Sequence, residues 1–275
     1  MDSILSSSQV QSFTSEIRSL GQGLVTNFFW DDKKHPYWLE EGRFFFLKEN
    51  NCYLLFHQND TFTHLFYIAT HQEAVATAIS HILPKNDIVI DLIVRKEGDG
   101  LTEILKDNGF ETYKALYRMS HIGLLAEDSW NPSLRVAYVT FSDLPLVYNA
   151  LQSSFDPLCE QLPTLKEVED FAQRKQILVV KDGDNLCGFI IFELSGSTTW
   201  YLRYWYISPD YRNQGIGSEL LRNALIKGKE TKRQQLWVLS DNENAIKRYE
   251  HYGFRREHLT DYVMIKRYDY ERKDC

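Results

Sequence analysis

The chain has 275 residues, which is long for one small domain and suits two, because domains commonly hold about 100 to 200 residues. Its composition of 43% hydrophobic and 25% charged residues is ordinary for a folded globular protein and excludes a largely disordered chain. A formal net charge of -7 argues against a sequence-independent grip on nucleic-acid phosphates and fits a neutral or cationic substrate better.

The cysteines and histidines carry no metal or disulfide signature. Cys52, Cys159, Cys187 and Cys275 lie far apart and form no CxxC pair, which favours free thiols in a reducing, cytoplasmic compartment. The histidines form neither HExxH nor a cluster with ligand spacing, so we expect no metal. No secretory leader is evident, and no stretch approaches the roughly 18 apolar residues of a membrane-spanning helix. We therefore expect a soluble protein without a membrane partner.

The first half of the chain predicts the element order helix, three strands, helix, strand, helix, strand. Apolar residues at helical spacing indicate the helices, and short apolar or alternating runs between turn residues indicate the strands. The expected helices cover Gln9–Leu20, His71–Leu83 and Leu101–Asn108, and the expected strands cover Arg43–Leu47, Cys52–His57, Thr63–Ala69, Asp87–Val94 and Phe110–His121.

A polar segment from Ala126 to Ser133 has the composition of a linker, with Asp128, Asn131 and Pro132 in it. A new apolar run begins directly after it. We therefore place a domain boundary here, which gives a first domain of residues 1–127 and a second of residues 128–275.

The second half predicts a similar order of elements. The segment Phe155–Pro163, with its prolines and its acidic and amide side chains, is expected to be an exposed loop. The expected strands cover Leu134–Thr140, Ile177–Val180, Cys187–Leu194, Trp200–Ile207, Gln235–Leu239 and Thr260–Lys266, with helices ending at Leu151, covering Thr164–Arg174, and starting near Gly217 and after Asn242.

A glycine-rich turn, Arg212-Asn213-Gln214-Gly215-Ile216-Gly217, follows the strand that ends at Ile207. Glycines at a strand-to-helix junction let backbone amides approach an anion, and the new helix adds unpaired N–H groups and a positive dipole end. A pyrophosphate would fit there. Such turns are also common as plain connectors, so this motif alone leaves both interpretations open.

A second pattern follows one helix and one strand later. The first pattern is Pro-x-x-Arg-x-x-Gly-x-Gly, and the second is Asn-x-x-Ala-x-x-x-Tyr-x-x-x-Gly-Phe. Their residues are Pro209, Arg212, Gly215 and Gly217, then Asn242, Ala245, Tyr249, Gly253 and Phe254. With both patterns in this order, residues 134–270 resemble the GCN5-related N-acetyltransferase (GNAT) superfamily.

The resemblance implies a site for acetyl-CoA as co-substrate. The loop from Arg212 through Ser218 would hold the pyrophosphate by backbone amides, and the preceding strand end would splay open to pair with the pantetheine arm. The residues expected to bind the coenzyme are Tyr206, Ile207, Arg212, Asn213, Gln214, Gly215, Ile216, Gly217, Ser218 and Asn242.

The resemblance also assigns Tyr249 the role of a general acid toward the leaving thiolate, whereas its helical spacing with Ala245 and Ile246 would otherwise indicate ordinary packing. The base that deprotonates the amine is harder to find, because the strand Trp200–Ile207 contains no carboxylate. Glu193 is the nearest candidate, with a solvated strand-end charge as the alternative interpretation.

The first half resembles a second, degenerate copy of the same fold. Its Asn108-Gly109-Phe110 parallels Tyr252-Gly253-Phe254, but Leu105 stands where the second copy has Tyr249, and residues 69–78 contain no glycine. We therefore expect an α/β fold with a mixed sheet, built from two tandem GNAT-like domains. Only the second should bind coenzyme A and catalyse, while the first serves as scaffold or borders the acceptor cleft.

The expected function is acetyl transfer from acetyl-CoA to a primary amine by direct attack. Acids and aromatics in 155–160, with Tyr201, Arg203 and Trp205 on one face of the central strand, could line the amine site. A small amine or amino acid is the first choice of acceptor, a peptide or protein amine the second, and aminoacyl transfer from a charged RNA the third. A coenzyme A-binding sensor or assembly module without turnover is the alternative of a different class.

Overall fold

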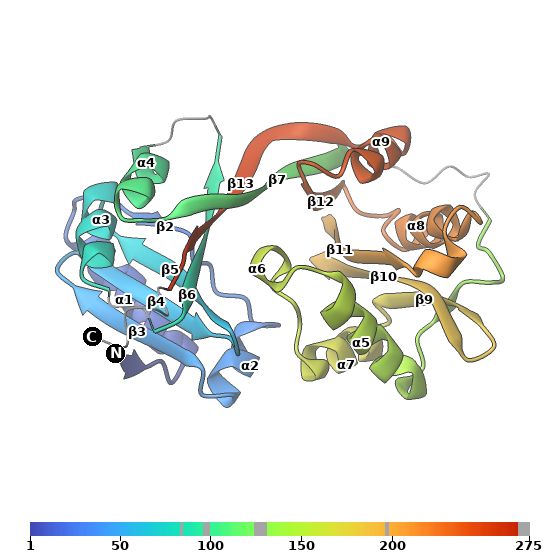
Figure 1. Ribbon diagram of the computed structural model, residues 1–275, viewed down its shortest axis with the longest axis horizontal. Coiled ribbons are helices and arrows are strands. Elements are labelled where there is room, and N and C mark those ends of the chain that lie inside the picture. The colour runs from blue at the N-terminus through green and yellow to red at the C-terminus, as the bar shows by residue number, and fades with distance from the viewer. Residues whose placement is uncertain (83–84, 96–99, 124–130, 196–197, 269–275) are drawn as a thin grey trace. The chain divides into compact units, whose positions relative to one another are not determined.

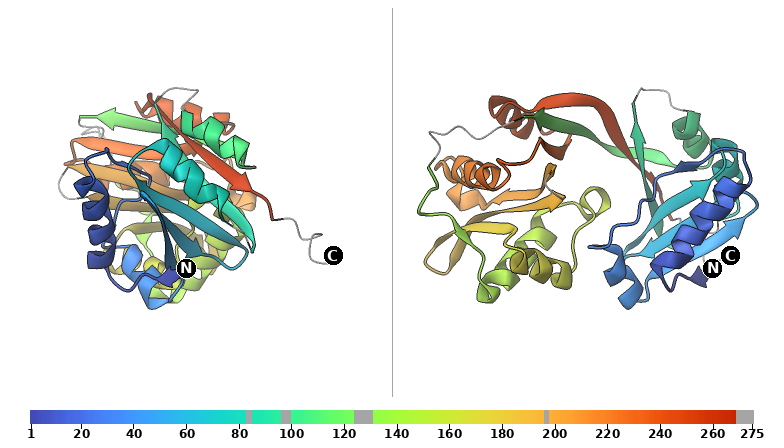
Figure 2. Two further views of the ribbon diagram at one scale, coloured as in Figure 1. Left: turned by 90° about the vertical axis from the view of Figure 1, so that its left-hand side faces the viewer. Right: turned by 180° about the vertical axis from the view of Figure 1, so that it is seen from behind.

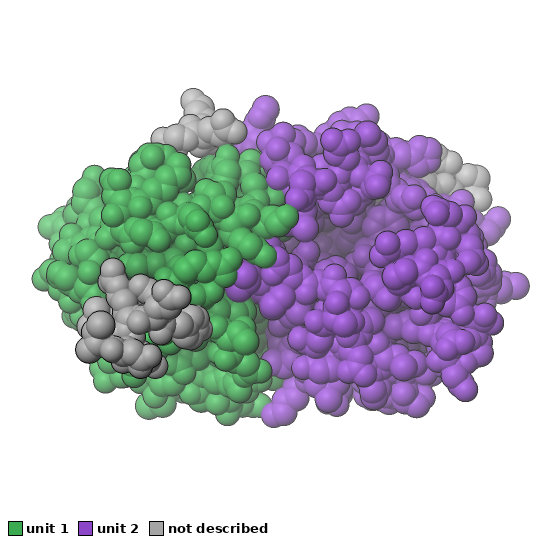
Figure 3. Space-filling view, in the orientation of Figure 1, with its two compact units in different colours: residues 1–116, 259–275 green, residues 117–258 purple. Residues whose placement is uncertain are grey.

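The computed structural model describes residues 1–82, 85–95, 100–123, 131–195 and 198–268 (Figure 1). The chain divides into two compact units, coloured separately in Figure 3. Unit 1 holds residues 1–116 and 259–275, and unit 2 holds residues 117–258. The predicted boundary between residues 127 and 128, and the predicted helix end at Leu83, lie outside the described residues, so that boundary stays a prediction.

Unit 1 is a mostly antiparallel sheet with helices on both faces (Figures 1 and 2). Its strands lie in the order β1-β3-β4-β5-β6-β13, and β2 pairs with β5. The strands are β1 (Asp2–Ser3), β2 (Val25–Thr26), β3 (Phe44–Glu49), β4 (Cys52–Gln58), β5 (Phe62–Ala69), β6 (Asp87–Val94), the start of β7 (Glu111–Ile122) and most of β13 (Arg255–Lys266). The helices are α1 (Ser7–Ser19), α2 (His35–Glu40), α3 (Gln72–Ser80) and α4 (Gly100–Asp107).

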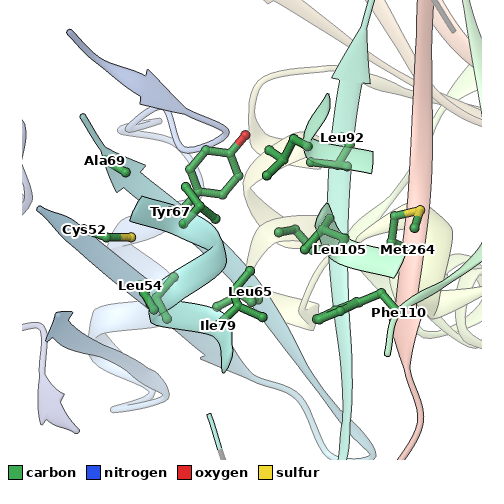
Figure 4. Close-up of a cluster of buried hydrophobic side chains, with 14 of the residues drawn as sticks. Cys52, Leu54, Leu65, Tyr67, Ala69, Ile79, Leu92, Leu105, Phe110 and Met264 are labelled. Atoms are coloured by element: carbon green, nitrogen blue, oxygen red, sulfur yellow. The ribbon is translucent and has the colours of Figure 1, made fainter. Parts of the chain in front are cut away.

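Successive side chains along the strands of unit 1 point to opposite faces of the sheet, and each face carries a hydrophobic core. In β4, Leu54 belongs to the core under α3 and α4, whereas Leu55 belongs to the core under α1 and α2. Successive strand residues point to opposite faces, so a strand that is apolar throughout requires cover on both. Figure 4 shows the first core, where Ile79 of α3 and Leu105 of α4 lie close to strand residues such as Leu65.

The last strand of the chain completes the sheet of unit 1. Residues 260–266 of β13 pair antiparallel with β6, with Met264 opposite Ile90. The sequence predicted this strand correctly but treated it as the closing strand of the second domain. Its pairing partner is a finding of the structure, because an apolar pattern shows which face of a strand is buried and not which strand lies beside it.

Unit 2 contains both parallel and antiparallel strand pairs, with the strand order β12-β11-β10-β9-β8. Its strands are β8 (Ala137–Tyr138), β9 (Ile177–Asp182), β10 (Asn185–Ser195), β11 (Thr199–Ile207) and β12 (Arg233–Leu239), together with the ends of β7 and β13 that belong to this unit. The helices are α5 (Leu144–Ser154), α6 (Pro157–Glu160), α7 (Leu165–Gln173), α8 (Ile216–Lys227) and α9 (Glu243–His251), with 3-10 turns at Phe141–Asp143 and Pro209–Tyr211.

Helices also cover both faces of the sheet in unit 2. Phe189 of β10 lies in the core with α5 and α7, and its neighbour Ile190 lies in the core with α8. The helix α7 begins with a capping box, in which the side chains of Thr164 and Glu167 each accept a hydrogen bond from the other residue's backbone N–H. The sequence predicted this start at Thr164.

Two short helices and one strand differ from the prediction. Helix α2 was not predicted, and α6 lies inside the segment expected to be a loop. The predicted strand Leu134–Thr140 is reduced to the two residues of β8. Leu134 is fully exposed, so its run lacks the buried face that a longer strand in a sheet needs.

The helices α4 and α9 end in the same way. Gly109 and Gly253 both have positive φ, of 82° and 84°. The N–H of Phe110 donates to the carbonyl of Leu105, and that of Phe254 donates to the carbonyl of Tyr249. This glycine-closed helix end is what the two Gly-Phe sequences require. The internal duplication inferred from them stays a prediction.

In the part of the chain that the structure describes, no helix has both the length and the apolar character needed to cross a membrane.

Four polar side chains form a row across one face of the unit 1 sheet. His57, His64, Asp91 and Asp261 lie on the neighbouring strands β4, β5, β6 and β13, and the strand register places them on one face. Nε2 of His64 lies 3.0 Å from Oδ2 of Asp91. Burial and the nearby Asp91 raise the pKa of Asp261 well above its usual value, and its Oδ1 has no partner among the described residues.

The substitution Asp261→Asn should stabilise the protein at neutral pH. Because the pKa of Asp261 is raised in the folded state, the unfolded chain loses this proton first as the pH rises. The carboxyl therefore costs no stability at low pH, and its destabilising effect is complete only above its folded-state pKa. We expect a gain on the order of 1 kcal/mol at pH 7.5 that vanishes near pH 3.5. Urea unfolding followed by tryptophan fluorescence at both pH values measures it.

The exposed turn residue Asp184 supplies the control, and Asp184→Asn should change the free energy of unfolding by less than about 0.5 kcal/mol at either pH. A loss of stability in Asp261→Asn at pH 7.5 would show that the Asp261 carboxylate is ionised and well solvated in the folded protein.

Candidate active site

The strands β11 and β12 separate halfway along their length. They pair in parallel from Thr199 opposite Arg233 to Leu202 opposite Leu236, although β11 continues to Ile207 and β12 to Leu239. The backbone of β11 after Leu202 therefore keeps an edge that β12 does not cover. This agrees with the splayed strand end that was expected near Tyr206 and Ile207.

A β-bulge sits where the separation begins. Ile191 of β10 pairs with Tyr204 and Phe192 pairs with Leu202, so Arg203 is the extra residue of β11. The extra residue reverses the alternation along the strand. Leu202 and Trp205 contact the same core, whereas Tyr204 faces the other one. The prediction that Tyr201, Arg203 and Trp205 share one face is therefore wrong, because a bulge is not visible in a strand's residue pattern.

The glycine-rich turn leads directly into α8. Asn213 and Gly215 have positive φ, of 62° and 81°, and Gly215 is the N-cap, with no side chain that caps the helix. The first-turn N–H groups of α8 are thus left for another acceptor. A Cβ on Gly217 would lie 3.1 Å from Cζ2 of Trp205, a tight contact that the ring of Trp205 would have to relieve by a small shift, so glycine favours this close approach of the helix to β11.

A cleft of about 760 Å3 opens between the free edge of β11, the turn and the start of α9. Of the residues expected to bind the coenzyme, those that line it are Tyr206, Ile207, Arg212, Asn213, Gly215, Ile216, Gly217, Ser218 and Asn242. Gln214 does not line the cleft, and its Nε2 donates to the carbonyl of Asp210. Oδ1 of Asn242 accepts from the N–H of Ala245 and so caps α9. Coenzyme contacts of these residues stay a prediction.

Tyr249 is buried behind the cleft rather than in its wall. Its ring centroid lies 5.6 Å from that of Trp205, which does line the cleft. Burial raises the pKa of Tyr249 above its usual value, and the negative charge of Glu160 raises it further, while Arg248 opposes this. The phenol is therefore held in its neutral form at physiological pH.

Glu193 lies on β10 opposite Tyr201, and it does not line the cleft. It is half-buried, and its negative charge acts on the guanidinium of Arg203, which is also half-buried. Glu193 therefore lies near the cation of Arg203, and the described residues show no contact between Glu193 and Tyr249. Its role as base stays a prediction.

Glu160 is a functional candidate that the sequence did not single out. It ends the short helix α6, and its negative charge acts on Tyr249. Burial raises the pKa of Glu160 to about 7, which Arg203 partly offsets and Asp156 increases. Only the acidic composition of residues 155–160 indicated such a group beforehand, since a loop's contacts cannot be read from its sequence.

Among the described residues, no group of three or more His, Cys, Asp or Glu side chains could hold a metal ion.

Comparison with known proteins finds a family match within this region. Residues 144–254 match the family model described as the acetyltransferase (GNAT) family, which confirms the predicted resemblance to the GNAT superfamily. A stretch of 66 residues is 33% identical to an uncharacterized N-acetyltransferase of Methanocaldococcus jannaschii, covering 22% of this chain and 29% of that relative. The match thus spans less than a third of that relative's length.

Solved structures with a similar fold extend over most of the chain. A GCN5-related N-acetyltransferase from Sphaerobacter thermophilus has a TM-score of 0.55 at 12% identity, over 79% of this chain and 76% of that one. An acetyltransferase from the GNAT family of Colwellia psychrerythraea has a TM-score of 0.54 at 14% identity, over 98% and 99%. A tandem GNAT protein from the clavulanic acid biosynthesis pathway has a TM-score of 0.53 at 11% identity, over 80% and 81%. These identities establish the fold alone, and the predicted fold class is confirmed.

The substitution Gly188→Ala should destabilise the protein by disturbing the free strand end. A Cβ at Gly188 of β10 would lie 2.7 Å from the backbone oxygen of Tyr206 and 2.7 Å from Cδ1 of Ile207. Because the backbone oxygen cannot move cheaply, we expect a cost of about 1–3 kcal/mol in urea unfolding.

Gly183→Ala in the β9–β10 turn is the control. Its Cβ would meet no atom within 4 Å, and only its positive φ of 59° carries a cost, on the order of 1 kcal/mol. Equal costs for the two variants would contradict the close approach at Tyr206.

Proposed function

We propose that this chain, whose residues 144–254 match the acetyltransferase (GNAT) family, transfers an acetyl group from acetyl-CoA to a primary amine. The observation that carries the proposal is one cleft that joins the free edge of β11 to the uncapped N-terminus of α8. A free strand edge suits an extended chain that bears amides, and a helix N-terminus suits phosphates. The coenzyme has both parts, a pantetheine arm and a pyrophosphate.

The residues of the turn fit the phosphates in both geometry and charge. Gly215 and Gly217 keep Cβ atoms out of the approach to the first-turn amides, and Arg212 adds a cation at the cleft. The backbone of β11 near Tyr206 would pair with the pantetheine amides. Bound in this way, acetyl-CoA supplies an activated thioester carbonyl.

In the proposed reaction, the acceptor nitrogen attacks the thioester carbon directly. The C–N bond forms, the C–S bond breaks, and the thiolate takes a proton from the hydroxyl of Tyr249. The nitrogen of the new amide loses its surplus proton to solvent, and the phenolate of Tyr249 regains a proton from solvent. The raised pKa of Tyr249 supports this role, because the phenol keeps its proton until a strong base such as a thiolate is released beside it.

The acceptor that we propose is a small amine or amino acid. The net charge of -7 and the carboxylates of Glu160 and Glu193 favour a cationic group over an anionic one. A peptide or protein amine is the second candidate for the acceptor, because it would react in the same way.

A thiol-release assay tests the proposed function. Purified protein is mixed with acetyl-CoA and a panel of primary amines, namely putrescine, phenethylamine, glycine and a short peptide, and free thiol is measured over time. Acetylation of any of these amines supports the proposal. Tight coenzyme binding without turnover on any amine would instead favour a sensor or assembly module.

The substitution Ser218→Asp should weaken coenzyme binding without unfolding the protein. Ser218 lies in the first turn of α8 and lines the cleft, so an aspartate there would repel a pyrophosphate while it stabilises the helix through the dipole. We expect acetyl-CoA to bind about tenfold more weakly by calorimetry, with no loss in thermal stability.

Arg222→Gln is the matched control, since it makes the same change in net charge on an exposed face of α8. Its affinity should change by less than about twofold, because exposed charges at this distance are largely screened. Equal binding by Ser218→Asp and the native protein would place the phosphates elsewhere.

The substitution Tyr249→Phe should lower kcat by about 10²-fold, because the thiolate then leaves without a proton donor. Coenzyme affinity should stay within about twofold, since Tyr249 lies behind the cleft wall. Thiol release with saturating amine measures kcat, and Tyr252→Phe on the same helix end is the control. Unchanged turnover in Tyr249→Phe would remove Tyr249 from the mechanism.

A further inference from the structure

The order of strand, helix and parallel strand that builds the cleft of unit 2 occurs in unit 1 as well. Residues 62–64 of β5 pair in parallel with residues 87–89 of β6, and α3 connects the two strands. As with β11 and β12, the pairing stops partway, although β5 continues to Ala69 and β6 to Val94. Unit 1 therefore has a gap of the same kind between two parallel strands, next to the start of the connecting helix.

In unit 1 this gap is filled by the chain itself. The strand β2 pairs antiparallel with the end of β5, with Thr26 opposite Ile68. Because β4 pairs with β5 along its whole length, β2 lies on the other edge of β5, the one that faces β6. Oγ1 of Thr26 also donates to the carbonyl oxygen of Tyr67, at 2.7 Å. The edge of β5 that β6 leaves uncovered is thus paired with a segment of its own unit.

The side chain of Asn27 spans the gap from one strand to the other. Its Oδ1 accepts a hydrogen bond of 2.8 Å from the N–H of Tyr67 in β5. Its Nδ2 donates a hydrogen bond of 3.1 Å to the carbonyl oxygen of Asp91 in β6. One carboxamide thus accepts from the first strand and donates to the second, as an amide of an extended ligand would do between two separated strands.

The start of α3 is also satisfied within unit 1. Its N-cap is His71, whose Nδ1 accepts a hydrogen bond of 3.1 Å from the N–H of Ala74. The N-cap of α8 is Gly215, which has no side chain to accept such a bond. The strand edge and the helix N-terminus, which border the cleft in unit 2, are therefore both provided with partners from the chain in unit 1.

Glycines direct the chain from α1 into the gap. Gly21 and Gly23 have positive φ, of 67° and 105°. A Cβ on Gly23 would lie 3.0 Å from the backbone oxygen of Thr70, directly after β5. Glycine permits both the backbone conformation and the close approach, so the insertion of this segment is favoured by the residue types that lead into it.

We propose that residues 25–27 take the place of a strand-edge ligand in unit 1, so that each chain binds one acetyl-CoA and binds it in unit 2. The inference rests on the proposed function, because it requires that the coenzyme occupies the cleft beside β11. A second pantetheine arm would have to displace this segment together with its hydrogen bonds to β5 and β6. Unit 1 thus carries its own occupant in the place where unit 2 has an open cleft.

Calorimetric titration of the full chain with acetyl-CoA tests the stoichiometry. The native protein should bind one coenzyme per chain. Ser218→Asp in unit 2 should weaken this binding about tenfold and should reveal no second site of native affinity. Two bound coenzymes per chain would overturn the inference and leave the proposed function intact.

Hydrogen exchange followed by mass spectrometry locates the coenzyme on the chain. Without coenzyme the N–H of Tyr67 is already bonded to Asn27, whereas the edge of β11 after Leu202 is not covered by β12. Saturating acetyl-CoA should slow exchange about tenfold in peptides that cover 203–207 and should change it less than about twofold in peptides that cover 65–69. A larger slowing in 65–69 than in 203–207 would place the coenzyme in unit 1 and overturn the inference.

The substitution Asn27→Ala tests whether the carboxamide holds the gap. The variant loses both hydrogen bonds across it, so the Tm should fall by about 3–8 °C and exchange in 65–69 should become at least about threefold faster. Affinity for acetyl-CoA should stay within about twofold. Asn59→Ala in the turn after β4 is the matched control, because the side-chain hydrogen bond of Asn59 is long, at 3.4 Å, and its Tm should change by less than about 2 °C.

The remaining outcomes separate the two proposals. Native stability and native exchange in Asn27→Ala would show that this segment does not hold the gap, and would overturn the inference alone. A native chain that binds no acetyl-CoA in the titration would overturn the proposed function itself, and with it this inference.

Discussion

The separation of β11 from β12 after the Leu202–Leu236 pair is the constraint on which the site depends. Parallel strands that stayed paired would bury the backbone groups of residues 203–207, and no extended ligand could reach them. The bulge at Arg203 begins the separation by bending one strand out of register. The close packing of α8 through Gly217 then sets the helix N-terminus beside the exposed edge. The strand edge and the helix N-terminus both have backbone groups without partners among the described residues, and both border the same cleft.

The same bulge divides the chemistry of β11 between its two faces. Trp205 turns toward the core that contains Tyr249, while Tyr204 turns toward the opposite core and fixes α6 by its hydroxyl. Arg203, between them, is a partly buried cation on which the charge of Glu193 acts, and it in turn lowers the pKa of Glu160. A buried charge is tolerated only with such compensation, so the acidic residues of two separate elements are drawn to this point of the strand.

The sequence predicted the parts of the site that depend on a backbone requirement. Gly215 adopts a positive φ, and Gly217 lies where a Cβ would be tightly packed against Trp205, so the residue type reflects the geometry. It also predicted most long helices and strands, whose periodicity follows burial. It could not predict the bulge at Arg203, the pairing of β13 with β6, or the contacts of Glu160. Each of these depends on residues distant in the chain, and a single sequence does not show which ones meet.

The charge of Glu160 in α6 acts on the phenol of Tyr249 in α9. The carboxylate disfavours the phenolate, so the pKa of Tyr249 rises, while burial brings the pKa of Glu160 to about 7. Between about pH 7 and the usual pKa of tyrosine near 10, the predominant state is therefore a charged Glu160 with a neutral Tyr249. In that state Tyr249 keeps the proton that the proposed reaction requires of an acid. Neutralising the carboxylate of Glu160 would ease ionisation of the phenol, so a charge on a separate helix supports the proposed acid role of Tyr249.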